Sequence, residues 1–351
     1  MASVLRAPTI LVRFLLLLSV GLTLAGEPAK EEKDPAEVRR FQLEDEFDGW
    51  CLAFSPDGNF ILTGNQLWET TSGKKIRQLD RAVKGYRHPE YLHSVCFSPD
   101  GKYVAGGVWG EYLGEPEIRL WEAATGKVVW KAVHSGAGPI AACFAPCVTF
   151  TPDGKHLLSG GGDGTGRLWA VATGKEVRRF EWERPAEKGD TDGSVVVSAD
   201  GKLALVCFPG RTALLWELET GKELSRICFL GHPVAVASPD CRYMLQGVAG
   251  VGEGEVILRD ARTGKEIRRF KAEASLGGIH CLAFSPDGRD AAGGSGTGRV
   301  HCWQVATGKT IQVFKGHEKG VNHVAFSPDG KFILSVSVDG DKTARLWRLK
   351  E

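Results

Sequence analysis

The chain has 351 residues, 42% of them apolar, and a formal net charge of +1 at pH 7. This apolar content excludes a largely disordered chain, and the near-neutral balance argues against a general binder of nucleic acid or acidic membranes. The 45 glycines are nearly double the usual share of about 7%, which indicates many tight turns.

The N-terminus has the pattern of a secretory leader. A basic region ending at Arg13 precedes the apolar run 14–25, and Thr23 and Ala25 stand three and one residues before Gly26. We therefore expect cleavage before Gly26 and export of the protein to a periplasmic or secreted location. The run is short for a membrane span, but Arg13 could snorkel and extend it, so a leader retained as a membrane anchor stays the alternative.

Three parts of the chain follow from composition and pattern. Residues 1–25 are the signal peptide, and residues 26–36, charged and without periodicity, are expected to form a solvated linker. From 37 to 351 one motif repeats. Its fullest copy spans 320–334 and places the turn Ser-Pro-Asp-Gly between two short runs of β type. Proline presets φ in such a turn and glycine supplies the left-handed residue, so each copy predicts a hairpin.

The turn motif occurs seven times, with an average spacing of about 45 residues. The copies start at Ser55, Ser98, Thr151, Ser198, Ser238, Ser285 and Ser327. In most copies a Leu-Trp pair and then a Thr-Gly-Lys follow in step with the turn. Three markers in fixed order at this period are the signature of four-stranded propeller blades. We predict an all-β fold, a seven-bladed β-propeller of four-stranded antiparallel blades.

The blade pattern also predicts how the ring closes. Because strand direction alternates, the uniform turns all lie on one face of the ring and the irregular connections on the other. The last blade lacks a fourth strand, whereas residues 37–41, Glu-Val-Arg-Arg-Phe, repeat the fourth strands at 176–180 and 266–270. The N-terminal strand is therefore expected to join the last blade. We interpret the Arg-Arg pairs as charge protection of an outer edge.

From about residue 37 to the end, the chain resembles the WD-repeat (WD40-type) β-propeller family, and with its leader it resembles an exported, bacterial-type member. Blades of this family commonly contain a buried Asp-His-Ser-Trp hydrogen-bond network, which the resemblance implies as a structural feature here. The last blade matches that network with His317, Ser335, Asp341 and Trp347. The third blade supplies Asp163, Ser159 and Trp169 but no clear histidine. The fifth blade carries Arg259 in place of the tryptophan.

Nine cysteines are present, an odd number. Most of them fall inside strand patterns, where a buried thiol is the ordinary state of a cysteine. We expect at most one disulfide, between Cys143 and Cys147, with the other cysteines at core positions. The spacing of that pair offers too few ligands for a zinc site.

No catalytic motif stands out in the sequence. It contains no nucleophile elbow, no His-Glu-x-x-His, no P-loop and no paired Cys-x-x-Cys, so we assign no catalytic, cofactor-binding or metal-binding residue and expect no cofactor. The expected function is that of a monomeric, non-enzymatic scaffold for a protein partner, displaying loops on one face of a rigid ring. The alternative is a secreted propeller enzyme or small-ligand binder that uses the central channel.

Three neighbouring insertions locate the expected binding site. They are the connection 80–93, the second hairpin of the second blade and the connection 181–193, all on the face of irregular connections. Tyrosine, tryptophan and arginine are enriched at binding hot spots. The candidate protein-binding residues are Arg81, Tyr86, Arg87, His88, Tyr91, Trp109, Tyr112, Trp182 and Arg184. The alternative is that these aromatic residues only pin long loops onto the ring.

Overall fold

The structure is a computed structural model. It describes residues 34–43, 51–80, 91–109, 116–134, 146–161, 163–181, 194–208, 212–229, 234–248, 254–272, 278–337 and 341–350. All of them belong to one compact unit, Asp34–Glu351. These described ranges contain strands and turns but no helix, and hence no helix long and apolar enough for a membrane span.

The strands form seven four-stranded antiparallel sheets, which confirms the predicted blades. The first three blades are β2 (Leu52–Phe54), β3 (Phe60–Thr63), β4 (Gln66–Glu69) and β5 (Lys75–Gln78); β6 (Tyr91–Phe97), β7 (Tyr103–Trp109), β8 (Glu117–Glu122) and β9 (Val128–Val133); and β10 (Cys147–Phe150), β11 (His156–Gly161), β12 (Thr165–Ala170) and β13 (Glu176–Glu181). The next two are β14 (Ser194–Val197), β15 (Leu203–Phe208), β16 (Thr212–Glu217) and β17 (Glu223–Cys228); and β18 (Ala235–Ala237), β19 (Tyr243–Val248), β20 (Glu255–Asp260) and β21 (Glu266–Lys271). The last two are β22 (Ile279–Phe284), β23 (Asp290–Ser295), β24 (Arg299–Gln304) and β25 (Thr310–Lys315); and β26 (His323–Phe326), β27 (Phe332–Ser337), β28 (Thr343–Arg348) and β1 (Glu37–Gln42).

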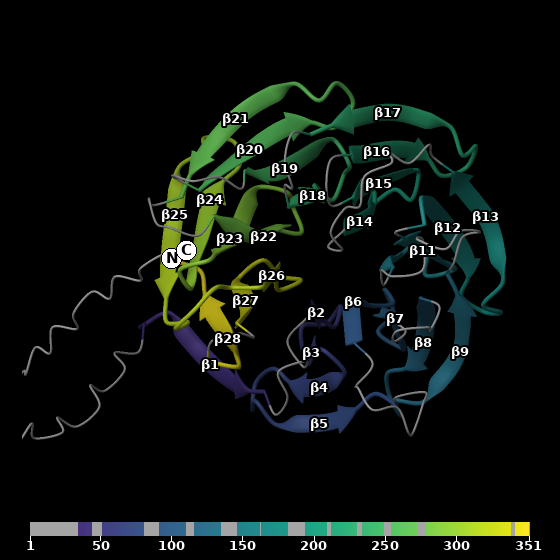
Figure 1. Ribbon diagram of the computed structural model, residues 1–351. Coiled ribbons are helices and arrows are strands. Elements are labelled where there is room, and N and C mark those ends of the chain that lie inside the picture. The colour runs from purple at the N-terminus through teal and green to yellow at the C-terminus, as the bar shows by residue number, and fades with distance from the viewer. Residues whose placement is uncertain are drawn as a thin grey trace, which may run out of the picture. The chain divides into compact units, whose positions relative to one another are not determined.

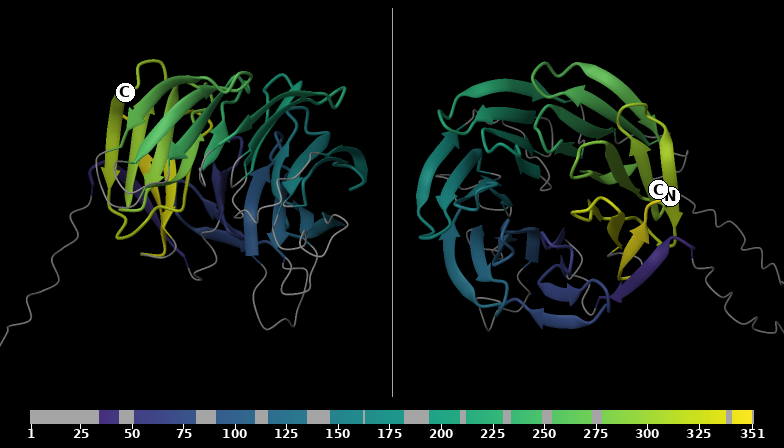
Figure 2. Two further views of the ribbon diagram at one scale, coloured as in Figure 1. Left: turned by 45° about the horizontal axis from the view of Figure 1, so that its top comes forward. Right: turned by 180° about the vertical axis from the view of Figure 1, so that it is seen from behind.

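The sheets follow one another around a ring, with the first strand of each blade innermost and the fourth outermost (Figures 1 and 2). β1 pairs antiparallel with β28, from Glu37 opposite Trp347 to Gln42 opposite Thr343. The N-terminal strand therefore completes the last blade, as predicted, and β28 has no unpaired edge.

Each Ser-Pro-Asp-Gly turn is held by contacts within five residues. In the last blade the Ser327 hydroxyl donates to Asp329 at 2.6 Å and accepts from the Phe332 amide at 2.9 Å. Gly330 has a φ of 71°, a left-handed conformation that glycine adopts without steric cost. The same serine- or threonine-to-aspartate hydrogen bond occurs in all seven blades. The turn is thus specified locally, which is why its sequence pattern predicted the blades.

Aromatic pairs join neighbouring blades. Phe314 on the outer strand β25 lies 5.5 Å from Trp347 of the next blade, between ring centroids, and Trp347 is fully buried. The same contact recurs as Phe41–Trp68, Phe180–Trp216 and Phe270–Trp303. Such pairs contribute about 0.5–1.5 kcal/mol each beyond the area they bury. The phenylalanine of the outer strand and the tryptophan of the Leu-Trp marker are therefore two halves of one contact between blades.

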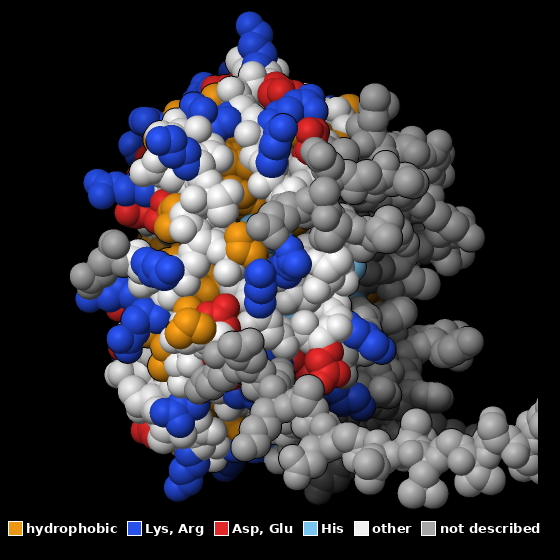
Figure 3. Space-filling view, turned by 90° about the vertical axis from the view of Figure 1, so that its left-hand side faces the viewer, with side chains coloured by type: hydrophobic (Ala, Val, Ile, Leu, Met, Phe, Trp, Pro, Cys, Tyr) orange, Lys and Arg blue, Asp and Glu red, His pale blue; other side chains and the backbone are white. Residues whose placement is uncertain are grey.

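The Arg-Arg pairs do more than protect an edge. The first arginine reaches the turn before the outer strand of the next blade: Arg268 donates to the Thr307 carbonyl at 2.9 Å, and Arg39 donates to the carbonyls of Thr71 and Ser72. The second pairs with the glutamate three residues earlier, as Arg269 does with Glu266 at 2.7 Å. One arginine thus connects blades, and the other leaves charge on the rim. The side of the ring seen in Figure 3 carries scattered lysine and arginine side chains with hydrophobic ones between them.

Cysteine positions agree with the sequence expectation only in part. Eight of the nine cysteines lie in the described ranges, and Cys143 lies outside them, so the Cys143–Cys147 disulfide stays a prediction. Cys51, Cys207, Cys281 and Cys302 are buried. The expectation of core positions was wrong for Cys228, which is exposed because it points outward from the outermost strand β17.

Candidate functional site

The predicted protein-binding residues fall almost entirely outside the described part of the chain. The residues outside it are Arg81, Tyr86, Arg87, His88, Tyr112, Trp182 and Arg184. Tyr91 and Trp109 lie within β6 and β7, where their backbones are paired partners at the end of the hairpin. Their participation in binding therefore stays a prediction.

The strand bounds nevertheless reveal an asymmetry between the two halves of the ring. The connections from the outer strand of one blade to the inner strand of the next span residues 79–90, 134–146 and 182–193 in the first half. They span only 229–234, 272–278 and 316–322 in the second half, and 43–51 where the last blade meets the first. The first set is about twice as long as the second. Extra chain on this face is therefore concentrated beside blades one to four, as the insertions in the sequence indicated.

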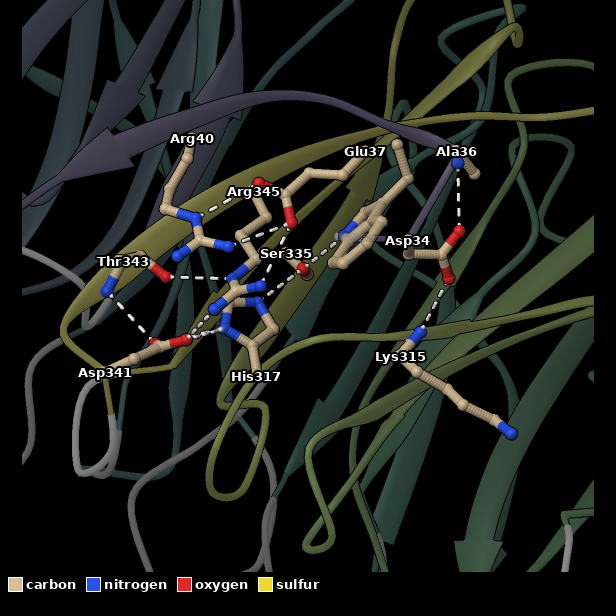
Figure 4. A network of polar contacts seen from close by, with 11 residues as sticks. Asp34, Ala36, Glu37, Arg40, Lys315, His317, Ser335, Asp341, Thr343 and Arg345 are labelled. Atoms are coloured by element: carbon tan, nitrogen blue, oxygen red, sulfur yellow. Dashed lines mark hydrogen bonds and ion pairs between the residues drawn. The ribbon is translucent and has the colours of Figure 1, made fainter. Parts of the chain in front are cut away.

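The structure brings His317, Ser335 and Asp341 together (Figure 4). Trp347 joins them through a hydrogen bond to Ser335. The His317 Nδ1 atom lies 3.1 Å from the Asp341 carboxylate, and Nε2 lies 2.8 Å from the Ser335 hydroxyl. That hydroxyl accepts a hydrogen bond of 2.7 Å from the Trp347 indole. The four side chains come from the connection before β26, from β27, from the segment before β28 and from β28 itself. They form a continuous buried chain of hydrogen bonds.

The network extends to the N-terminal strand. Arg345 is 1% exposed and bonds to Asp341 at 2.6 Å and to Glu37 of β1 at 3.0 Å. Glu37 also pairs with Arg40 at 3.1 Å. Burial alone would raise the pKa of Asp341, but its hydrogen bonds and the nearby charges, first of all those of His317, lower it to about 2. Burial lowers the pKa of His317, which the Asp341 carboxylate only partly offsets. The arrangement holds a strand in place and leaves no group open to a substrate.

A second copy of this network, between blades two and three, includes a histidine that sequence reasoning missed. His134 directly follows β9 and lies against Trp169 of the third blade, with 6.2 Å between ring centroids. Its Nδ1 atom is 3.7 Å from Asp163, which pairs with Arg167 at 2.6 Å. Ser159 accepts the Trp169 indole at 2.8 Å. The sequence signal that could have found it is a histidine immediately after a predicted outer strand. In the last blade the histidine is one residue further along, in the dipeptide Gly316-His317.

The inner strands offer little for catalysis. The residues two positions before each turn serine or threonine are small or apolar and half-buried: Ala53, Cys96, Thr149, Val196, Val236, Ala283 and Ala325. A hollow of about 540 Å³ along β14, β18, β22 and β26 is lined by apolar side chains alone. His93, His280 and His323 lie nearer the opposite ends of their strands. Within the described ranges, no three histidine, cysteine, aspartate or glutamate side chains gather closely enough to hold a metal ion.

The fold is a seven-bladed propeller, and its buried polar networks lie where neighbouring blades meet. Comparison with known families names the class: a family model described as "WD domain, G-beta repeat" matches residues 48–77, 81–121, 135–170, 264–304 and 308–348, more than half of the chain. The chain belongs to the WD40 repeat family. The matched segments leave out 171–263, where Ala199, Cys241 and Arg259 depart from the repeat.

Curated relatives share the repeat at low identity. The chain is 29% identical over 253 residues to a "Serine-threonine kinase receptor-associated protein" of Gallus gallus, covering 69% of this chain and 67% of that protein. It is 22% identical over 320 residues to a "Guanine nucleotide-binding protein subunit beta" of Oryza sativa subsp. indica, covering 85% and 80%. A "WD repeat-containing protein 26 homolog" of Arabidopsis thaliana is 25% identical over 312 residues, and this chain spans about half of its length. These animal and plant relatives give no support to a bacterial-type exported member.

Proposed function

We propose that the protein is a non-enzymatic scaffold that binds a protein partner through the irregular connections beside blades one to four. The observation that carries this proposal is the asymmetry in connection length around an otherwise regular ring. Long surface connections on a rigid frame are where binding residues concentrate, because the frame fixes them at little entropic cost. The candidate hot spots are the tyrosine, tryptophan and arginine residues of 80–93, the second-blade hairpin and 181–193.

The names of two relatives support a partner that is a protein. One relative is described as associated with a receptor kinase and the other as a subunit of a guanine nucleotide-binding protein. The channel alternative has less support, because small and apolar side chains line the inner strands near the turn face. A catalytic channel needs convergent polar groups.

Export belongs to the same proposal. The basic region, the apolar run 14–25 and the small residues before Gly26 support a cleaved leader. We expect the charged residues 26–36 to form a solvated linker in either outcome, cleavage or anchoring. The partner of the scaffold would then be a protein outside the cytoplasm.

Cross-linking and alanine substitution test the binding site. A photoreactive residue at position 86 should cross-link the partner, whereas the same residue at Lys202, exposed on the opposite turn face, should not. Alanine at Tyr86, Arg87, Trp109 or Trp182 should each weaken binding of the isolated partner by at least about 1 kcal/mol, with the melting temperature unchanged. Normal binding by all four variants, or unfolding of all four, would place the site elsewhere.

A further inference from the structure

His134 occupies a position that other blades fill with an apolar side chain. Val133 and Lys315 hold equivalent positions in their blades. Val133 pairs with Glu117, four residues before Trp121, and Lys315 pairs with Arg299, four residues before Trp303. His134 is therefore equivalent to Gly316, one residue before His317. The same position after the outer strand holds buried apolar residues in other blades, namely Leu43, Phe229 and Ala272. A titratable ring thus occupies a position that is apolar in these three blades.

This shift in position leaves the His134 ring without the hydrogen bonds that His317 makes. The His134 side chain is 0% exposed, and neither ring nitrogen has a hydrogen-bond partner within the described ranges. The ring lies so close to β11 that a Cβ at Gly161 would come within 2.2 Å of it. A neutral, unbonded imidazole in such a site already loses its hydration without compensation.

The groups facing His134 are charged and buried with it. Asp163, 0% exposed, and Arg167, 4% exposed, come from the third blade. Glu176 of β13 lies 3.5 Å from Arg167 on the far side of that pair. Protonation of His134 would therefore add a second buried cation beside Arg167. Burial lowers the pKa of His134 to about 4, and the Asp163 carboxylate only partly offsets this.

From this geometry we propose that the seam between blades two and three is an acid-sensitive joint, in which protonation of His134 favours local separation of β9 from β11 and β12. The seam between blades six and seven is the built-in contrast. There His317 is hydrogen-bonded at both nitrogens, within an otherwise matching Asp-Arg-Glu arrangement.

The direction of the pH effect follows from linkage. A histidine released to solvent takes a proton near its ordinary pKa of 6.5, whereas the closed seam holds the pKa of His134 near 4. The closed state is therefore fully favoured above pH 6.5 and loses that advantage as the pH falls toward 4. A single-site linkage with these values raises the opening equilibrium constant about 20-fold between pH 7 and pH 5.

Hydrogen exchange of the whole chain tests the proposal. After correction for intrinsic rates, amides of β9, β11 and β12 should lose about 20-fold in protection between pH 7 and pH 5, while those of β19 and β20 should change much less. A loss spread evenly over all blades, or no loss, would overturn the proposal.

Matched substitutions separate this role from a merely structural one. His134→Leu introduces the residue that stands at the equivalent position as Leu43, and His134→Phe the residue that stands there as Phe229. If one variant fails to fold, the other can still be tested. Either should keep or raise the melting temperature at pH 7 and abolish the acid-dependent loss of protection. His317→Leu should lower the melting temperature at pH 7, because it removes the hydrogen bonds that His317 makes with the buried Ser335 and with Asp341. An unchanged acid response in the His134 variants would refute the proposal.

Discussion

At the scale of single residues, two departures from the repeat occur at the same contact between blades. In five seams the turn proline of one blade packs near the turn glycine of the next; a Cβ at Gly288, for example, would lie 3.8 Å from Pro239 Cδ. Between the fourth and fifth blades Ala199 replaces that proline and Cys241 replaces that glycine. The Ala199 amide donates to the Pro239 carbonyl at 3.0 Å, a bond that proline cannot make. The Cys241 side chain is buried beside it despite a φ of 55°.

The coupling between these two residues is testable. Ala199→Pro should reduce the free energy of unfolding by about 1–2 kcal/mol, because it removes the amide donor and places a ring carbon against the next turn. In a Cys241→Gly background, which restores the pairing of the other seams, the same change should cost less. Denaturant unfolding of the two single variants and the double variant measures the difference. Strictly additive effects would show that the residues act independently.

At the scale of elements, the closing strand is attached more firmly than an ordinary outer strand. Glu37 of β1 is equivalent to Glu176 and Glu266, yet its side chain is 2% exposed and bonds to the buried Arg345. Glu266 is 37% exposed and pairs with a rim arginine. Glu176 also contacts a buried arginine, Arg167 at 3.5 Å, but it is 27% exposed. Of these three glutamates, Glu37 is therefore the one that is almost fully buried, and it lies where the two ends of the repeat array meet.

Neutralising these two glutamates should have unequal effects. Glu37→Gln should reduce the free energy of unfolding by about 2–4 kcal/mol, since it leaves the buried Arg345 with one carboxylate fewer. Glu266→Gln should cost less than about 1 kcal/mol, as expected for an exposed pair. Urea unfolding at pH 7 gives both values. Equal losses would mean that closure depends on strand pairing alone.

At the scale of the whole molecule, each pair of neighbouring blades packs together in a similar way, but the buried side chains between them differ. Aromatic pairs and side chains donating to the next turn recur around it, whereas the buried polar networks differ from seam to seam. Neighbouring blades contact one another all around the ring, and His134 is a buried ring without hydrogen bonds at one of these contacts within the described ranges. We therefore expect local opening between blades two and three before opening between blades six and seven, where His317 is hydrogen-bonded.

The proposed export depends on the leader at residues 1–25. We expect the mature chain to begin at Gly26, which intact-mass measurement of the extracytoplasmic protein would show. Ala25→Arg should block cleavage, because the site requires a small residue, whereas Ala29→Arg in the linker should leave it unchanged. A full-length wild-type chain recovered from membranes would establish the anchored alternative.

The sequence by itself determined the number of blades, their strand order and the closure by residues 37–41. These features depend on short-range contacts, such as those of Ser327 with Asp329 and Phe332, and on a motif repeated often enough to reveal its period. It also located two of the three longer connections, 79–90 and 182–193, since their lengths follow from the spacing of the turns. The third, 134–146, was not among the predicted insertions. The choice of hot-spot residues within them stays a prediction, because those side chains lie outside the described ranges.

Tertiary structure alone decided which side chains meet across the seams. His134 joins Asp163 over 29 positions of sequence, and Ala199 contacts Pro239 over 40, with no repeated motif to announce either contact. The buried role of Glu37 was equally hidden, because its sequence context matches that of the exposed Glu266. Burial and hydrogen bonding between two blades depend on the facing blade. A one-residue shift along the chain, as between His134 and His317, is enough to replace a hydrogen-bonded histidine with one whose ring nitrogens have no hydrogen-bond partner within the described ranges.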